Sequence, residues 1–168
     1  MDRAVIIMGV AGCGKSSLGA ELASALGRPL IEGDAHHSAA NRARMTQGVA
    51  LTDADRDGWL SALAAQLREH PGCVLTCSAL KRKYRDRLRA ASPGLAFLFL
   101  EIPRDESLAR VSARGASHFF SADLVDSQFA TLESPVGEPL VLRLDAMAPL
   151  PQLRAEAVAW LADNPGTA

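Results

Sequence analysis

The chain has 168 residues, 48% hydrophobic and 22% charged, a composition typical of a folded globular protein and not of a disordered, collagen-like or coiled-coil chain. Eighteen Lys and Arg against nineteen Asp and Glu give a formal net charge of -1, so no overall field attracts nucleic acid or an anionic membrane. Three cysteines are too few for a disulfide framework, and the apolar run at residues 4–8 is too short for a signal peptide or membrane span. We therefore expect free thiols in a cytoplasmic protein without nucleic-acid or membrane partners.

Short apolar runs alternate with amphipathic stretches, and this alternation predicts βαβ units around a parallel sheet. The expected strands are residues 4–8, 29–32, 73–77, 95–102 and 140–144. The expected helices, from apolar residues at helical spacing, are residues 15–26, 41–47, 55–68, 81–91, 105–114, 122–132 and 153–161. With no repeat and no Gly/Ser-rich linker, residues 1–168 are expected to form one α/β domain, with helices on both faces of a five-stranded parallel sheet.

Two polar, histidine-bearing stretches, residues 33–40 and 115–121, interrupt the helical patterns. Loops at the carboxyl ends of strands are where α/β sheets bind their ligands. We expect the first stretch to be a substrate loop and the second a short lid.

The strongest motif follows the first expected strand directly and precedes a helix. Residues 9–16, Gly-Val-Ala-Gly-Cys-Gly-Lys-Ser, match G-x-x-x-x-G-K-[ST], the P-loop. Backbone N–H groups of such a loop wrap around phosphates, Lys15 reaches the β and γ oxygens, and Ser16 ligates Mg²⁺. ATP and Mg²⁺ are therefore the expected cofactors. The expected nucleotide contacts in the loop are Gly9, Ala11, Gly12, Cys13, Gly14, Lys15, Ser16 and Ser17.

The P-loop leaves the reaction open, but other features narrow the choice. The Asn-Lys-x-Asp element that reads guanine is absent, since Asn41 precedes Arg42 and Asn164 precedes Pro165, which disfavours a GTP switch. The third expected strand ends without the aspartate that ATPase motors place there. Asp34, just past the second strand, is a candidate to orient Mg²⁺ or to accept the proton of a substrate hydroxyl. A turn or N-cap aspartate is the alternative interpretation.

Two groups of cations are candidates for anion binding. Residues 81–89 carry six, and Lys81 and Arg85, four apart, are expected on one helical face, where they would clamp an anionic group of the acceptor. The remaining members are interpreted as solvated surface or, as an alternative, a nucleic-acid contact. Arg110 and Arg114 are also four apart, so they either cover a transferring phosphoryl group or are ordinary helix-surface charges.

Several of these motifs resemble the bacterial-type gluconate kinases, small P-loop kinases related to shikimate and adenylate kinases. The resemblance runs through the P-loop, Glu32-Gly33-Asp34, the Cys77-Ser78-Ala79-Leu80-Lys81 run, and His118-Phe119 with Ser127-Gln128-Phe129. It implies ATP- and Mg²⁺-dependent phosphorylation of the 6-hydroxyl of D-gluconate on a core of five parallel strands, often as a homodimer.

Together, motifs and resemblance give the expected roles. The catalytic residues are Lys15, Asp34 and Arg114; the nucleotide contacts include Arg110; the metal ligands are Ser16 and Asp34. The expected substrate contacts are Asp34, His37, Arg42, Arg56, Ser78, Lys81, Arg85, His118 and Gln128. The alternatives are a kinase for another small polyol acid such as shikimate, or a nucleotide-dependent binding module that uses residues 81–89.

Overall fold

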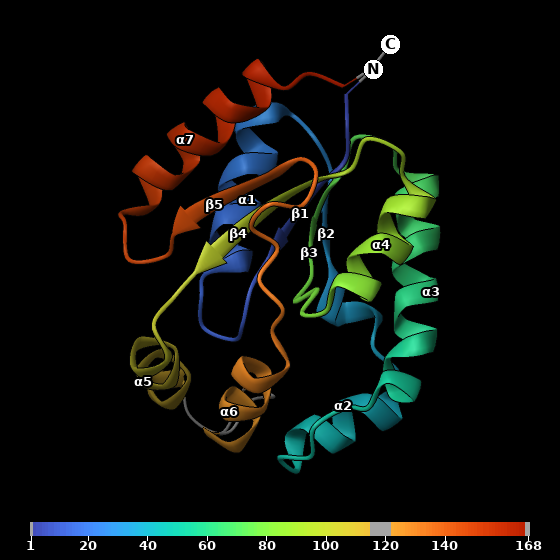
Figure 1. The fold of residues 1–168 in the computed structure, drawn as a ribbon, viewed down its shortest axis with the longest axis vertical. Helices are drawn as coiled ribbons and strands as arrows, with labels where there is room; N and C mark the ends of the chain where they lie inside the picture. Colours follow the sequence, from blue (N-terminus) through green and yellow to red (C-terminus); the bar gives the residue numbers. More distant parts are fainter. Residues whose placement is uncertain (1, 115–121, 167–168) are drawn as a thin grey trace.

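The computed structural model describes residues 2–114 and 122–166 (Figure 1). Within these residues, five strands form one sheet in the order β2-β3-β1-β4-β5, and all neighbours are parallel. The strands are β1 Val5–Met8, β2 Leu30–Glu32, β3 Val74–Thr76, β4 Ala96–Glu101 and β5 Val141–Asp145. The predicted five-stranded parallel sheet is confirmed.

The helices form outer layers and a cap at one end of the sheet. They are α1 Lys15–Leu26, α2 Ala39–Thr46, α3 Asp53–Glu69, α4 Arg82–Ala91, α5 Arg104–Arg114, α6 Ala122–Thr131 and α7 Leu150–Asp163. Helices α1 and α7 cover one face and α3 and α4 the other, while α2, α5 and α6 lie beyond the carboxyl ends of the strands (Figure 1). The three-layer α/β architecture is therefore confirmed, and three further helices lie beyond the carboxyl edge of its sheet.

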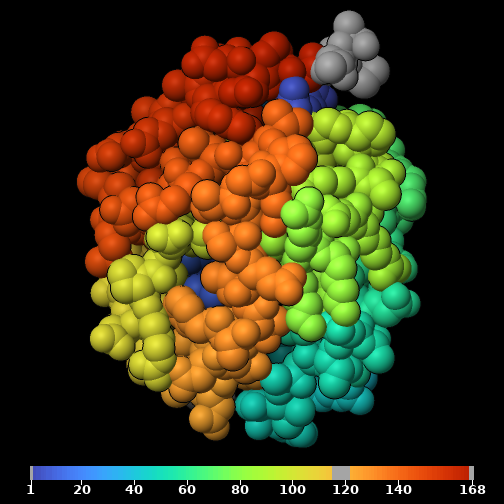
Figure 2. All heavy atoms as spheres, viewed as in Figure 1, coloured from blue at the N-terminus to red at the C-terminus, as the bar shows by residue number. Residues whose placement is uncertain are grey.

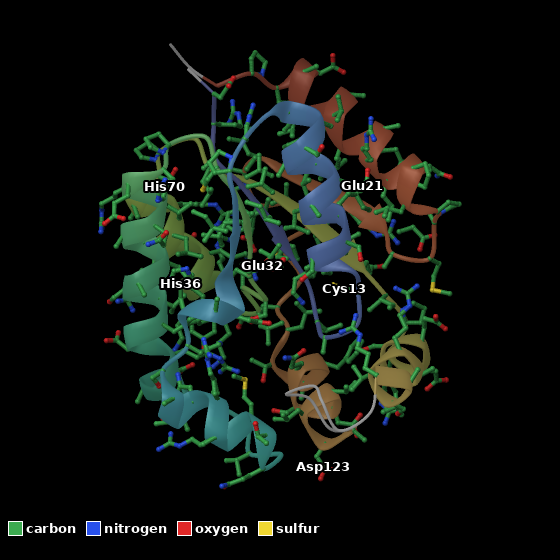
Figure 3. All side chains as sticks on the ribbon, turned by 180° about the vertical axis from the view of Figure 1, so that it is seen from behind. Cys13, Glu21, Glu32, His36, His70 and Asp123 are labelled. Atoms are coloured by element: carbon green, nitrogen blue, oxygen red, sulfur yellow. The ribbon has the colours of Figure 1, made fainter. Side chains whose placement is uncertain are left out.

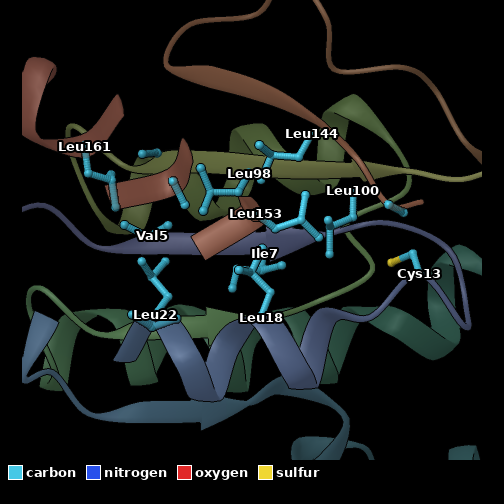
Figure 4. Close-up of a cluster of buried hydrophobic side chains, with 14 of the residues drawn as sticks. Val5, Ile7, Cys13, Leu18, Leu22, Leu98, Leu100, Leu144, Leu153 and Leu161 are labelled. Carbon is cyan, nitrogen blue, oxygen red and sulfur yellow. The ribbon is translucent and has the colours of Figure 1, made fainter. Parts of the chain in front are cut away.

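Strand β1 is buried on both faces, which explains its uninterrupted apolar sequence. Val5 and Ile7 face α1 and α7, in a cluster with Leu18 and Leu22 (Figure 4). The alternate residues point to the opposite face because side chains along a strand alternate. There, Ile6 and Met8 pack in a second cluster, whose helical members are Trp59, Leu60, Leu63, Leu67, Tyr84 and Leu88.

Two helices begin earlier than expected because of their N-caps. Helix α3 begins at Asp53 because Thr52 and Asp55 form a capping box: the Thr52 Oγ1 accepts from the Asp55 amide at 3.1 Å, and the Asp55 carboxylate accepts from the Thr52 amide at 2.9 Å. Helix α2 begins after Ser38, whose Oγ accepts from the Asn41 amide. The polar stretch 33–40 contains a 3₁₀ turn, η1 Gly33–His36, and the expected lid, residues 115–121, lies outside the described residues.

All three cysteines are free and buried, as expected from their number and spacing. Burial raises the pKa of the Cys73 thiol to about 11 and that of Cys77 to about 12, so both remain protonated and unreactive at neutral pH. In the part of the chain that the structure describes, the helices are too short or too polar to span a membrane.

Candidate active site

A glycine brings the ends of β2 and β3 together at the carboxyl edge of the sheet. A Cβ on Gly33 would lie 2.1 Å from the carbonyl oxygen of Thr76, so a larger residue would push the strands apart. The Gly33 amide donates to the Thr76 hydroxyl at 3.3 Å. This close approach places the two acidic residues beside Gly33, Glu32 and Asp34, at the edge of the sheet where the P-loop also lies.

The P-loop connects β1 to α1 and is packed against α5. Gly12 has a φ of 76°, and a Cβ there would meet the Ser107 carbonyl oxygen at 3.1 Å, so the position favours glycine. The Lys15 ammonium donates back to the carbonyl oxygens of Gly9 and Val10 at 3.0 and 3.1 Å. The Lys15 ammonium thus lies over the loop, in front of the amino end of α1, which is where a helix binds phosphate.

Helices α5 and α6 hold the tip of the loop. The Ser107 hydroxyl donates to the Ala11 carbonyl oxygen at 2.6 Å, and the Ala11 amide donates to Gln128 Oε1 at 2.6 Å. Arg110 donates to the carbonyl oxygen of Gly12 at 3.1 Å. Figure 2 shows a hollow between the yellow α5 and the orange segment that contains α6, with blue N-terminal atoms at its bottom. Sequence reasoning missed Ser107, because nothing in an amphipathic helix marks a serine that faces a distant loop.

A small pocket, partly open to solvent, lies next to the loop. It unites five of the expected substrate residues. They are Asp34, His37, Arg56, Ser78 and Gln128, with Met45, Ala50, Leu51, Trp59, Leu124 and Ser127 completing the wall. Because Gln128 both lines this pocket and binds the Ala11 amide, the pocket adjoins the phosphate-binding loop.

His37 is held in the pocket as a neutral ring. It is buried and stacks on Trp59, with ring centroids 4.3 Å apart, while the Trp59 indole donates to the Gly33 carbonyl oxygen at 2.9 Å. Burial lowers the pKa of His37 to about 4, although the Asp34 carboxylate opposes the shift. The imidazole is therefore neutral at neutral pH. Its Nδ1 lies 3.4 Å from the Asn41 side-chain amide nitrogen, which leaves Nε2 for a substrate hydroxyl.

Glu32 is a site residue that sequence reasoning missed. Its carboxylate accepts hydrogen bonds from Ser16 at 3.2 Å and from Thr76, which places it beside the amino end of α1 (Figure 3). A carboxylate with neighbouring hydroxyls suits Mg²⁺, which takes few protein ligands and binds mainly phosphate oxygens and water. Described residues contain no group of three His, Cys, Asp or Glu that would form a cage for a metal. The available signal was the position of Glu32 as the last residue of a strand, two before Asp34.

The prediction that Arg85 contacts substrate is wrong. Arg85 is fully buried, with its Nε 2.9 Å from Glu138 Oε1 and its Nη2 2.6 Å from Oε2. Its Nη1 donates to the Ala79 carbonyl oxygen, and its Nη2 also donates to that of Glu133. The Arg85 guanidinium therefore links α4 to the segment after α6 and does not line the pocket.

Lys81 is also absent from the pocket wall, and it does not share a helical face with Arg85. It is the N-cap residue of α4, outside the regular helix, and its ammonium lies 3.0 Å from Asp53. Each other cation of the 81–89 run also has a carboxylate within 4.0 Å. The pairs are Arg82–Asp86, Lys83–Asp53, Arg87–Asp57, Arg89–Asp86 and Arg89–Glu138. Local compensation of the charge argues against a nucleic-acid surface here.

The remaining expected residues lie around the site or outside the described chain. Arg42 is exposed and donates to the Ala35 carbonyl oxygen, outside the pocket wall. Ser17 is exposed in the first turn of α1. Arg114 is the last residue of α5, and its side chain is exposed. His118 lies outside the described residues.

Comparison with known proteins agrees with this geometry. The family profile for shikimate kinase matches residues 11–130. A gluconokinase of Gluconobacter oxydans is 42% identical over 146 residues, which are 84% of this chain and 82% of that relative. The thermoresistant gluconokinase of Escherichia coli is 37% identical over 91% of this chain and 90% of its own length.

Similarity extends to solved structures. The crystal structure of a gluconokinase from Sinorhizobium meliloti superposes with a TM-score of 0.89 at 43% identity, covering 96% of this chain and 93% of that one. Both the sequence and the arrangement of the sheet and helices are therefore shared over nearly the full length. The chain belongs to the shikimate kinase family of nucleotide-dependent kinases and, within it, to the gluconokinases.

Proposed function

We propose that this chain transfers the γ-phosphoryl group of ATP to the 6-hydroxyl of D-gluconate, giving 6-phosphogluconate and ADP. The observation that carries the proposal is the shared position of Gln128, which lines the polar pocket and accepts from the Ala11 amide of the P-loop. A hydroxyl bound in this pocket lies next to the loop that binds the phosphates of ATP. Membership among the gluconokinases supports the same acceptor.

The pocket suits a linear polyol acid. His37, Ser78 and Gln128 provide neutral donors and acceptors for a row of hydroxyls. Arg56 is the cation of the pocket wall, and a guanidinium binds a carboxylate through paired hydrogen bonds. We therefore assign Arg56, in place of Lys81 and Arg85, to the gluconate carboxylate.

Transfer requires an oriented hydroxyl and stabilised phosphate charge. Asp34 lines the pocket, half-buried, and we assign it to orient the 6-hydroxyl and accept its proton as the oxygen attacks the γ-phosphorus. We assign Lys15 and the loop amides to the phosphates. Arg110, which donates to the Gly12 carbonyl oxygen, and Arg114, at the end of the same helix, are assigned to cover the transferring charge. The bond to the β-phosphate oxygen breaks, and ADP leaves with that electron pair.

The donor set beside the loop fits Mg²⁺. Ser16 and Glu32 would hold it, directly or through water, and the ion would neutralise charge on the phosphate oxygens. Asp34 is thereby left for the acceptor hydroxyl, a division of roles between the two acidic residues beside Gly33. The free, buried thiols are consistent with a reducing cytoplasmic compartment.

An ADP-release assay with Mg·ATP tests the proposal against gluconate, shikimate, glycerate and nucleoside monophosphates. We expect selective turnover of gluconate. Asp34→Asn should lower kcat by about 10²–10⁴ with ATP binding retained, whereas Asp163→Asn, an exposed aspartate at the end of α7, should not change it. Turnover of shikimate instead of gluconate would refute the substrate, and full activity of Asp34→Asn would refute the assigned base.

A further inference from the structure

Arg56 enters the pocket with its charge unpaired. It lies in the first turns of α3 and lines the pocket, and within the described residues no carboxylate forms an ion pair with it. A long side chain with several rotatable bonds nevertheless needs a partner to fix its direction. An unpaired guanidinium that is already oriented binds a carboxylate well, because little side-chain entropy is lost and no ion pair has to be broken on binding.

The partner that fixes Arg56 is a neutral oxygen. Its Nη1 donates to the Tyr84 hydroxyl at 3.2 Å, and its guanidinium carbon lies 5.6 Å from the centroid of that ring. Tyr84 is buried in α4, with 3% of its surface exposed. Burial, together with the hydrogen bond to Asp53, raises the pKa of Tyr84, so the group is a phenol at neutral pH. It holds the guanidinium without neutralising it.

Asp53 fixes the direction of the phenol. A phenol has one proton, and the Tyr84 hydroxyl donates it to Asp53 Oδ1, which leaves the lone pairs of its oxygen to Arg56. Lys81 and Lys83 both contact the same carboxylate. Hydrogen bonds from Lys83, Tyr84 and Lys81 hold the pKa of Asp53 well below its usual range, so it remains an ionised acceptor.

We propose that Tyr84 is a positioning residue that acts through Arg56: backed by Asp53, it aims the guanidinium at the acceptor's carboxylate and keeps its charge available. The proposal rests on the proposed function and deepens it. In this arrangement Lys81 contacts Asp53, behind Arg56, and does not contact the substrate. Without the hydroxyl, Arg56 loses the acceptor that fixes its direction.

Tyr84→Phe keeps the buried ring and removes only the hydroxyl. We expect the KM for gluconate to rise about tenfold, since a hydrogen bond to a charged group is lost, while kcat and the KM for ATP change less than about twofold. Arg87→Gln is the matched control, because Arg87 also joins α4 to α3, through Asp57 and Ser61, without a link to Arg56. Its kinetic constants should equal those of the wild type.

A double-mutant cycle separates positioning from a general structural role. On an Arg56→Ala background, Tyr84→Phe should cause no further loss in gluconate KM, and Asp53→Asn should show the same dependence with a smaller effect. Equal losses on both backgrounds, or no loss from Tyr84→Phe in the wild type, would overturn the proposal. Absence of gluconate turnover by the wild-type enzyme would overturn the proposed function as well, so the two failures are distinguishable.

Discussion

Glu138→Gln tests the structural role of the buried Arg85 most sharply. Glu138 has 5% of its side chain exposed and Arg85 none, and Arg89 also lies 3.0 Å from the same carboxylate. Burial raises the pKa of Glu138, but hydrogen bonds from Arg85 and Arg89 outweigh it and hold that pKa below its usual value. The pair is therefore ionised at neutral pH, and the substitution leaves buried arginine charge without a counter-ion.

Breaking a buried ion pair from one side costs about 3–5 kcal/mol, a large part of the roughly 5–15 kcal/mol that stabilises a typical domain. For a chain of this size, about 2–4 °C of melting temperature is lost per kcal/mol, so the expected drop in Tm is roughly 6–20 °C. Urea unfolding and thermal melting followed by circular dichroism measure both quantities. The KM for gluconate, taken well below the variant's Tm, should stay close to the wild-type value.

Glu21→Gln is the control, because it removes one partner of an exposed ion pair, Glu21–Arg154 at 3.2 Å, and should cost under about 1 kcal/mol. A loss below about 1 kcal/mol for Glu138→Gln would refute the structural role argued for Arg85. So would an unchanged Tm together with a gluconate KM raised about tenfold or more, the result expected if Arg85 bound the substrate.

Three other substitutions probe the site. Glu32→Gln should raise the Mg²⁺ concentration for half-maximal activity about tenfold or more, seen in a Mg²⁺ titration; an unchanged titration would place the metal elsewhere. Burial lowers the pKa of His37 from 6.5 to about 4, so the unfolded chain takes up this proton first and wild-type stability falls as pH drops through that window. In urea unfolding, His37→Asn should lose less stability than the wild type between neutral pH and about pH 4.5. Equal losses in the two proteins would contradict the lowered pKa of His37. Ser107→Ala should raise the KM for ATP more than that for gluconate, because the Ala11 carbonyl loses its donor; the reverse order would show that Ser107 does not support the loop.

The fold was largely predictable from local patterns. Alternating apolar runs and amphipathic stretches marked every described strand and α-helix. Each of these elements buries one or both faces, so its apolar residues recur at a regular spacing. Only element ends were off: the start of α3 was misplaced because the capping box of Thr52 and Asp55 extends the helix by two residues beyond its apolar pattern. The order of the strands in the sheet depends on long-range packing that these local patterns do not contain.

The site was predictable where residues follow strands and less so where helices supply them. The P-loop, Asp34 and Ser78 lie at the carboxyl ends of strands, and parallel topology brings such ends together. Helical spacing did not reveal that Arg85 faces the protein interior, since its partner Glu138 lies far along the chain. Nor did this spacing show that Lys81 precedes the first turn of α4.

The position of the transferred phosphate on the product tests the central claim most directly. After incubation of the enzyme with Mg·ATP and D-gluconate, proton-coupled ³¹P NMR of the purified product should show a phosphomonoester resonance split into a triplet, because C6 is a methylene carbon. A doublet would place the phosphate on a secondary hydroxyl and contradict the orientation assigned to Asp34 and Arg56. Absence of any phosphorylated gluconate, with ATP left intact, would contradict the proposed function itself.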